Sequence, residues 1–264
     1  MSDSPLPRLD LQEDERIDRV NEQLCLIQKK SGLTYGTDAF LLAAYVKASS
    51  RAKAVELGGG TGIVSLLLAA KKKAGHITAI EVQPEFAELI DRNAKINGLD
   101  ALVKSLCMDV RDASPTQLEG EVDLVFTNPP YMRTDSGRRN ATDQKYIARH
   151  EVCGTVVDFC AAAGRLLRHG GKFVCVWRPD RLTELMSAMQ SARLEPKRMT
   201  MVHADLSLEP CMVLIECIKG AAPAMRISPP LILYQKRSPE DKQRVLTPEA
   251  QKIYDTCSFL NEDA

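Results

Sequence analysis

The sequence predicts an α/β fold, built on a mostly parallel seven-stranded sheet with helices on both faces and a C-terminal antiparallel hairpin. Three observations support this prediction. From Ala54 onward, short apolar and β-branched runs alternate with segments of helical periodicity. A glycine-rich turn, residues 58–62, joins the first of these strands to the first helix. The last two strands are separated by only a short polar loop, which is typical of an antiparallel hairpin.

The elements of this core follow one another in a regular order. The seven expected strands cover residues 54–57, 77–82, 103–108, 122–127, 172–177, 197–202 and 211–218. The expected helices cover residues 63–73, 84–97, 155–167 and 179–192. Pro84 stands at a first helical position, where the missing N–H of proline costs nothing. Asn97-Gly98 then provides a left-handed stop for the same helix.

Shorter elements are expected on both sides of the core. Residues 18–20 and 24–28 can pair as a small hairpin. Thr37 is expected to cap a helix that carries Asp38 in its first turn. Thr247-Pro248-Glu249 has the pattern of a helix start near the end of the chain.

The length of 264 residues fits one domain with appendages. We expect a single domain over 1–264, with an N-terminal extension (1–50), a catalytic core (51–220) and a C-terminal tail (221–264). We find no internal repeat or low-complexity segment in the sequence.

Charge and cysteine content limit the classes of function. Lys and Arg number 35, as do Asp and Glu, so any binding of a polyanion must come from a local patch. None of the eight cysteines forms a C-x-x-C pair, which favours small buried thiols in a reducing compartment over a zinc site. The N-terminus is unlike a signal peptide, and no run of 18 apolar residues exists. We therefore expect a cytoplasmic monomer or weak dimer with no metal and no membrane span.

The chemistry is expected at Asn128-Pro129-Pro130-Tyr131, directly after the strand 122–127. Two consecutive prolines cannot continue a strand ladder, because neither has an N–H to donate. The carbonyls of Asn128 and Pro129 can each accept one N–H, and Tyr131 can stack on a ring. This set suits a planar group that carries an NH2. The alternative is a plain Pro-Pro loop with a half-buried tyrosine.

A small-molecule site is expected at the same edge of the sheet. Glycines at 58–62 let a ligand approach the backbone, and Glu56 before them suits a cationic ligand rather than a pyrophosphate. Glu81 ends the second strand, where its carboxylate can accept from both hydroxyls of a ribose. Asp109 follows the third strand and can accept from an adenine amino group. The alternatives without a ligand are a tight strand–helix turn for the glycines, a solvated strand end for Glu81 and a loop carboxylate or helix cap for Asp109.

In this order the motifs resemble those of class I S-adenosylmethionine-dependent methyltransferases, which have a Rossmann-like sheet. Residues 56–62 are similar to the first motif of that family, Glu81 to its ribose acid and Asp109 to its adenine contact. The resemblance implies S-adenosyl-L-methionine as cofactor, with these binding residues: Glu56, Gly58, Gly60, Gly62, Glu81, Asp109, Val110 and Asn128. Residues 128–131 match the catalytic motif of the amino-methylating branch, which modifies adenine N6, cytosine N4 or glutamine amide nitrogen. This implies Asn128, Pro129, Pro130 and Tyr131 as catalytic residues.

Flanking segments extend the resemblance over nearly the whole chain. Residues 35–43, 148–151 and 229–234 resemble bacterial tRNA adenine-N6 methyltransferases that act beside the anticodon of a valine tRNA. The implied substrate is tRNA, and the candidate contacts are Tyr35, Thr37, Asp38, Arg133, Arg138, Arg139 and Arg149. The chain departs from the family in its three consecutive glycines, where a single acid, a Gly, a variable residue and a Gly are more usual.

The segment 132–151 is the expected site of RNA contact. It holds five cations against three acids, which adds a net of two positive charges just after the catalytic motif. Arginines there can contact phosphates or stack on bases. The alternative is a solvated charged loop.

Three classes of function fit these motifs. The first is an RNA adenine-N6 methyltransferase. The second is a protein-glutamine N5-methyltransferase acting on a release factor or ribosomal protein, although such enzymes resemble chains with a longer helical N-terminal domain. The third is a catalytically silent module that only binds the cofactor. A DNA methyltransferase is a lesser variant of the first class, because the chain has no room for a target-recognition domain.

Overall fold

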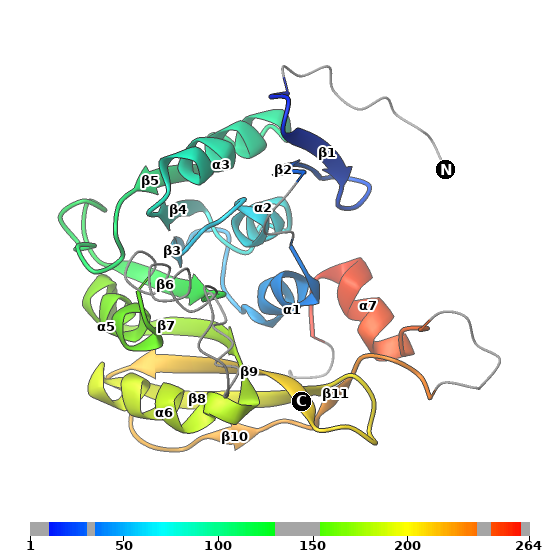
Figure 1. Cartoon of the computed structure of the whole chain (residues 1–264). Coiled ribbons are helices and arrows are strands. Elements are labelled where there is room, and N and C mark those ends of the chain that lie inside the picture. Colours follow the sequence, from blue (N-terminus) through cyan, green and yellow to red (C-terminus); the bar gives the residue numbers. More distant parts are fainter. Residues whose placement is uncertain (1–10, 31–34, 130–153, 237–243, 260–264) are drawn as a thin grey trace, which may run out of the picture.

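The computed structural model describes residues 11–30, 35–129, 154–236 and 244–259. Its centre is one large sheet with the strand order β10-β8-β9-β7-β6-β3-β4-β5 (Figure 1). Seven of its strands correspond to those expected from the sequence: β3 (Lys53–Leu57), β4 (His76–Glu81), β5 (Val103–Cys107), β6 (Val122–Thr127), β7 (Leu167–Trp177), β8 (Leu194–His203) and β9 (Pro210–Lys219). The two-residue strands β10 (Arg226–Ile227) and β11 (Leu231–Ile232) both pair with β8.

The sheet is parallel except at β9. Strands β3 to β7 pair in parallel, whereas β9 runs antiparallel to both β7 and β8. The mostly parallel sheet and its C-terminal hairpin are therefore confirmed. The chain runs outward from β3 through β4 to β5 and then returns to β6, which lies on the other side of β3. The direction in which successive strands are added therefore changes at the boundary between β3 and β6. Ligands of open α/β sheets bind at such a point, outside the carboxyl ends of the strands.

Strand β7 begins earlier than the sequence indicates. The expected strand starts at Lys172, whereas β7 follows the preceding helix directly from Leu167. Between the pairs Val122–Leu167 and Leu124–Lys172 the register shifts, so extra residues bulge out of β7. Gly170 has a φ of 75° within this bulge. The glycine that indicated a turn therefore forms a bulge inside a strand.

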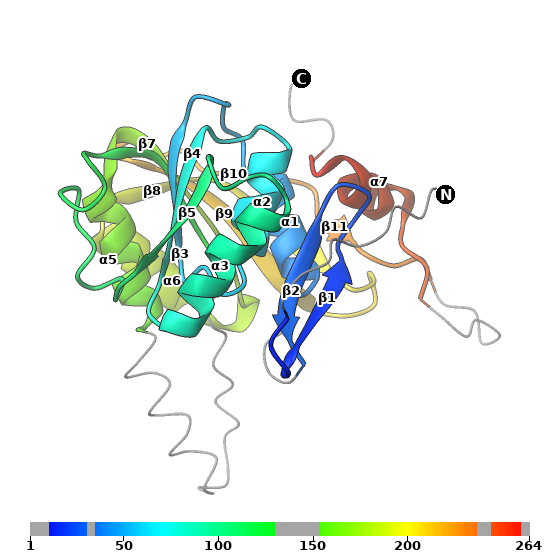
Figure 2. The same cartoon turned by 90° about the horizontal axis from the view of Figure 1, so that it is seen from above.

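Helices cover both faces of the sheet, as expected. Figure 2 shows α5 (Val156–Leu166) and α6 (Leu182–Ser191) on one side, and α1 (Thr37–Tyr45), α2 (Ile63–Ala70) and α3 (Pro84–Ile96) on the other. Each face has its own apolar core. One is centred on α1 and α2, and the other on α5 and α6.

Two helix starts differ from the predictions. Residues 179–181 form a short 3₁₀ turn, and the α-helix proper begins at Leu182. The residue that caps α1 is Gly36, not Thr37, and no side chain makes a capping hydrogen bond there. Thr37 is instead the first helical residue. The backbone of Gly36 is extended, and a Cβ at this position would lie 2.9 Å from Oδ1 of Asp38.

The two ends of the chain pack against the core. The expected hairpin is present as β1 (Glu15–Arg19) and β2 (Cys25–Lys29), which pair antiparallel. The last helix, α7 (Pro248–Thr256), is capped by the hydroxyl of Thr247 and packs against α1. Among the described residues, no helix is long and apolar enough to cross a membrane, and no group of three or more His, Cys, Asp or Glu side chains could hold a metal ion.

Candidate active site

The expected site residues meet at the carboxyl edge of the sheet. Leu57 pairs with both Ile80 and Thr127, so the ends of β3, β4 and β6 lie side by side. The glycine turn follows β3, Glu81 is the last residue of β4, and Asn128 follows β6. Thr127 adds a direct link, because its buried hydroxyl donates to the Leu57 carbonyl at 2.7 Å.

The side-chain amide of Asn128 is hydrogen-bonded at one end and, among the described residues, unpaired at the other. Its Nδ2 donates to Oδ2 of Asp38 at 2.9 Å. Its Oδ1 is buried and has no hydrogen-bond partner among the described residues. A buried amide oxygen without a partner costs free energy, so it calls for an explanation. Pro129 beside it is buried as well, and no backbone N–H of the described residues donates to its carbonyl.

The glycine turn and Glu81 form one hydrogen-bonded unit. One carboxylate oxygen of Glu81 accepts from the backbone N–H of Gly60 at 2.9 Å, and the other from that of Gln83 at 3.0 Å. The turn is tied to β4 again because the N–H groups of Gly58 and Gly59 share the Ile80 carbonyl. The oxygen bound to Gln83 also accepts from the Gln83 side-chain amide at 3.4 Å, so the oxygen bound to Gly60 keeps acceptor capacity and a ribose hydroxyl could take the place of that side-chain amide.

Gly60 shows that a ligand can approach this turn closely. Its φ is 54°, and a Cβ added to it would meet nothing within 4 Å. The open space lies directly above the backbone that Glu81 holds. A nucleoside whose ribose reaches Glu81 fits this arrangement.

Glu56 is buried below the turn and bonded to the start of α2. One of its oxygens accepts from the backbone N–H of Ser65 at 3.2 Å and also from the Ser65 hydroxyl. Burial raises the pKa of Glu56 to about 8, against the lowering effect of the Ser65 hydrogen bonds. A nearby cation would favour the ionised form of this carboxyl group.

Asp109 follows β5 and is paired with a neighbour. Its carboxylate accepts from the backbone N–H of Arg111 at 2.8 Å and from the Arg111 guanidinium. The Arg111 hydrogen bonds lower the pKa of Asp109. An adenine amino group at Asp109 would therefore share this carboxylate with Arg111. Val110 is buried in the core under α5.

The substrate contacts implied by the N-terminal motif lie around the start of α1. The Tyr35 ring packs on Phe40 with centroids 5.9 Å apart, and Phe40 packs on Tyr254 of α7 at 5.2 Å. Burial raises the pKa of Tyr254, and a hydrogen bond with Thr37 lowers it in part. Tyr254, which the sequence did not single out, thus joins the tail to this site. The other predicted residues, Pro130, Tyr131, Arg133, Arg138, Arg139 and Arg149, lie outside the described residues.

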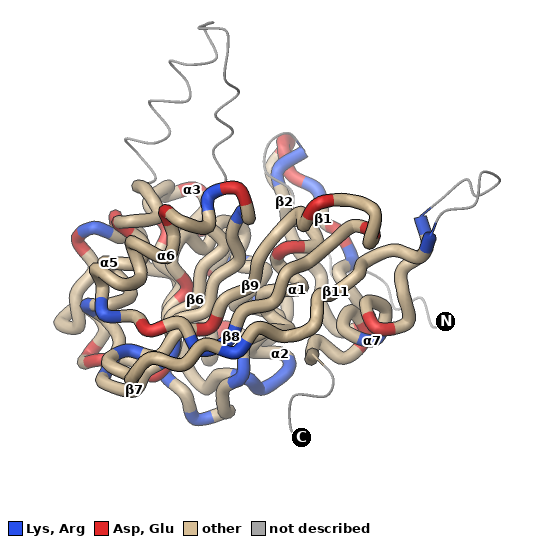
Figure 3. Tube along the Cα trace, turned by 90° about the horizontal axis from the view of Figure 1, so that it is seen from below, with Lys and Arg blue, Asp and Glu red and all other residues tan. Residues whose placement is uncertain are grey.

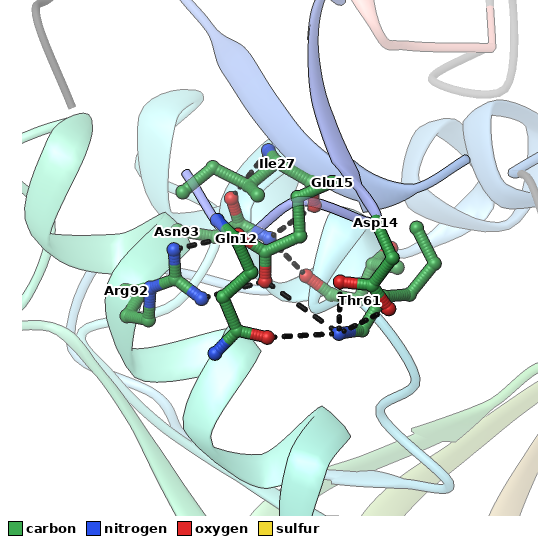
Figure 4. A network of polar contacts seen from close by, with 8 residues as sticks. Gln12, Asp14, Glu15, Ile27, Thr61, Arg92 and Asn93 are labelled. Carbon is green, nitrogen blue, oxygen red and sulfur yellow. Dashed lines mark hydrogen bonds and ion pairs between the residues drawn. The ribbon is translucent and has the colours of Figure 1, made fainter. Parts of the chain in front are cut away.

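Asn93 is a second residue that the sequence did not single out. It lies fully buried on α3, and its Nδ2 donates to the carbonyls of Ile27 (3.1 Å) and Thr61 (3.0 Å). Its Oδ1 accepts from the Ile27 N–H at 2.7 Å. Figure 4 shows it between β2 and the glycine turn, near the ion pair of Arg92 with Glu15. Asn93 therefore joins the hairpin, α3 and the glycine turn. An asparagine on the apolar side of a helix was the feature of the sequence that could have indicated this role.

A pocket of about 580 Å³ lies at the opposite edge of the sheet, where β3, β6 and β7 begin. Its charged lining residues are Lys47, Arg51, Asp123, Arg168 and Lys172. None of the site residues expected from the sequence lines it. The chemistry described above therefore belongs to the carboxyl edge and not to this pocket.

The model of one protein family, the methyltransferase small domain, matches residues 30–193. The chain belongs to this family. It is accordingly a methyltransferase, and S-adenosylmethionine is its methyl donor. Glu81, Gly60 and the orphaned oxygen of Asn128 fit such a donor beside an acceptor group.

Two curated relatives are similar over most of their length. Both are named tRNA1(Val) (adenine(37)-N6)-methyltransferase. The one from Porphyromonas gingivalis is 28% identical over 202 residues, which are 74% of this chain and 78% of the relative. The one from Bacteroides fragilis is 28% identical over 194 residues, which are 74% of this chain and 81% of the relative.

A solved structure supports the fold. The crystal structure of a predicted O-methyltransferase from Agrobacterium tumefaciens matches with a TM-score of 0.66 and 24% identity. The match covers 84% of this chain and 97% of that one. This likeness shows the Rossmann-like fold and does not identify the atom that accepts the methyl group.

Proposed function

We propose that this methyltransferase modifies the exocyclic N6 amine of an adenine in tRNA, at a position beside the anticodon of a valine tRNA. The observation that carries the proposal is the buried Oδ1 of Asn128, which lacks a partner among the described residues. The names of the two curated relatives support the choice of tRNA and adenine. The roles given below to the individual residues are part of the same proposal.

The acceptors after β6 suit an amine that is a poor nucleophile. The lone pair of an exocyclic amine is delocalised into the ring, so its hydrogens lie in the plane of the base. Asn128 Oδ1 and the Pro129 carbonyl can each accept one of these hydrogens and so localise the lone pair on nitrogen. Positive charge then develops on the amine next to acceptors that are already oriented. A strong general base is not needed.

The cofactor side of the site is proposed to be formed by the turn and the acids around it. Bound S-adenosylmethionine would supply an electrophilic methyl group. Glu81 would hold the ribose, Gly58, Gly60 and Gly62 would allow close approach, and Glu56 would face the cationic end. Asp109 would accept from the adenine amino group, with Val110 beside the ring. Holding the amine in line with the methyl group then contributes much of the rate.

RNA contact is proposed to be local, at Arg133, Arg138, Arg139 and Arg149, together with Tyr35 and Thr37 near the start of α1. Figure 3 shows Lys and Arg interspersed with Asp and Glu along the described trace, in keeping with the zero net charge. A general attraction to RNA is therefore not expected. Tyr131 is proposed to stack on the flipped base.

Steady-state methylation of tRNA by Asn128→Ala tests the proposal. Loss of one such acceptor should lower kcat by about 10²–10³-fold. Binding of S-adenosylhomocysteine, measured by calorimetry, should stay within about twofold of wild type. Near-normal turnover by Asn128→Ala would contradict the role of the amide. Methylation of a release-factor glutamine, with tRNA left unmodified, would favour the protein-glutamine alternative.

A further inference from the structure

The catalytic amide is held by a residue distant in the chain. Asp38 lies in the first turn of α1, 90 positions before Asn128, and its Oδ2 accepts from Asn128 Nδ2 at 2.9 Å. Asn128 is half-buried, and in the described part of the chain this is the hydrogen bond that its side chain makes. The orientation of the amide therefore depends on the group at position 38.

A carboxylate at that position allows only one orientation. Ionised Asp accepts hydrogen bonds and cannot donate them, whereas the two ends of an Asn amide are a donor and an acceptor of almost equal size. With Nδ2 facing Asp38, Oδ1 is left as the end that meets the substrate. A rotated amide would set Oδ1 against the carboxylate and present N–H groups to the incoming amine.

Asp38 is itself held in place. Its Oδ1 accepts from the backbone N–H of Ala39 at 2.9 Å. Its carboxylate lies at the N-terminal end of α1, where the helix dipole favours negative charge. Gly36 leaves room for it, since a Cβ there would come within 2.9 Å of the carboxylate oxygen. Several independent features thus hold this carboxylate where Asn128 needs it.

We infer that Asp38 is a positioning residue, which fixes the Asn128 amide with its oxygen toward the substrate amine. This inference rests on the proposed amine methylation and deepens it. It also gives Asp38 a role different from the direct substrate contact that the motif resemblance implies. Asn at position 38 could donate to Asn128 Oδ1, so it would stabilise the rotated amide as well.

The test is a double-mutant cycle of Asp38→Asn and Asn128→Ala. Asp38→Asn alone should lower kcat about 10- to 100-fold, the range for loss of a hydrogen bond to a charged group. The Michaelis constant for tRNA, the affinity for S-adenosylhomocysteine and the melting temperature should change little. In the Asn128→Ala background, Asp38→Asn should change kcat by no more than about twofold. Asp91→Asn on α3, which bonds Ser105, is the matched control and should leave kcat unchanged.

An equal loss of rate in both backgrounds would overturn the inference, because Asp38 would then act on the substrate or the fold independently of Asn128. Hydrogen exchange of the Asn128 side-chain NH2, followed by NMR, gives a readout without turnover. Exchange should be slow in wild type and faster in Asp38→Asn. Exchange as fast as that of an exposed asparagine in wild type would refute the positioning role. If wild type fails to methylate tRNA, the proposed function fails, and the NMR result alone decides the positioning role.

Discussion

The buried carboxyl group of Glu56 should make the stability of the protein fall as the pH rises from about 4.5 to about 8. Its pKa is raised from 4.5 to about 8 by burial, so the folded state holds a proton there that the unfolded chain has already released. Between these two pH values the folded state therefore binds more protons than the unfolded state, and the free energy of unfolding decreases with pH. Each pKa unit corresponds to about 1.4 kcal/mol, so the full effect has an upper bound of about 5 kcal/mol.

Urea unfolding of wild type and Glu56→Gln at pH 5 and pH 8.5 measures this effect. Glutamine keeps an oxygen that can accept both Ser65 hydrogen bonds and has no charge to bury. The variant should gain about 2–5 kcal/mol relative to wild type between the two pH values. Burial lowers the pKa of Lys73 to about 8, so Lys73 also titrates before pH 8.5, but it does so in both proteins and its effect cancels in the comparison. Parallel pH dependence in the two proteins would refute the assignment of a buried, protonated Glu56.

Three further predictions concern the cofactor and the RNA. Glu81→Ala should weaken binding of S-adenosylhomocysteine by roughly 10- to 100-fold in calorimetry, as expected for loss of a charged acceptor, and unchanged binding would exclude the ribose role. Asn93→Ala should lower the free energy of unfolding by about 2–3 kcal/mol and also weaken cofactor binding, because Ile27 and Thr61 lose their shared partner. A loss of stability with normal cofactor affinity would show that Asn93 does not link the hairpin to the cofactor site. Joint replacement of Arg138 and Arg139 by Ala should raise the Michaelis constant for tRNA and flatten its salt dependence by about 0.7 in log–log slope per lost phosphate contact. The control variant combines Lys71→Ala and Lys72→Ala at the end of α2, away from the site. It removes the same charge and should change neither the Michaelis constant for tRNA nor its salt dependence.

Most of the fold could be predicted from sequence patterns within single helices and strands. Strand–helix alternation, Pro84 and the Thr247 cap depend on local backbone chemistry, and the structure bears them out. The bulge at Gly170 was not predictable in the same way. A glycine with positive φ serves a turn and a bulge equally well, and only the pairing of β7 with β6 and β9 distinguishes the two.

The site was predictable where residues follow strand ends and unpredictable where distant segments meet. Parallel strands bring Glu81 and Asn128 to one edge, so the sequence order alone indicates that they converge. The contact of Asp38 with Asn128 and the bridge from Asn93 to Thr61 depend on how α1 and α3 pack on the sheet. A sequence shows only that polar residues occur in otherwise apolar helices.

The most direct test of the proposed function is nucleoside mass spectrometry of valine tRNA from cells that lack this protein. The purified tRNA is incubated with S-adenosylmethionine and either wild type or Asn128→Ala, then digested and compared with tRNA from normal cells. We predict that N6-methyladenosine is missing beside the anticodon in the deficient cells, that wild type restores it, and that Asn128→Ala does not. Normal N6-methyladenosine in the deficient cells, or restoration by Asn128→Ala at the wild-type rate, would contradict the proposal that the Asn128 oxygen accepts from an adenine amine of tRNA.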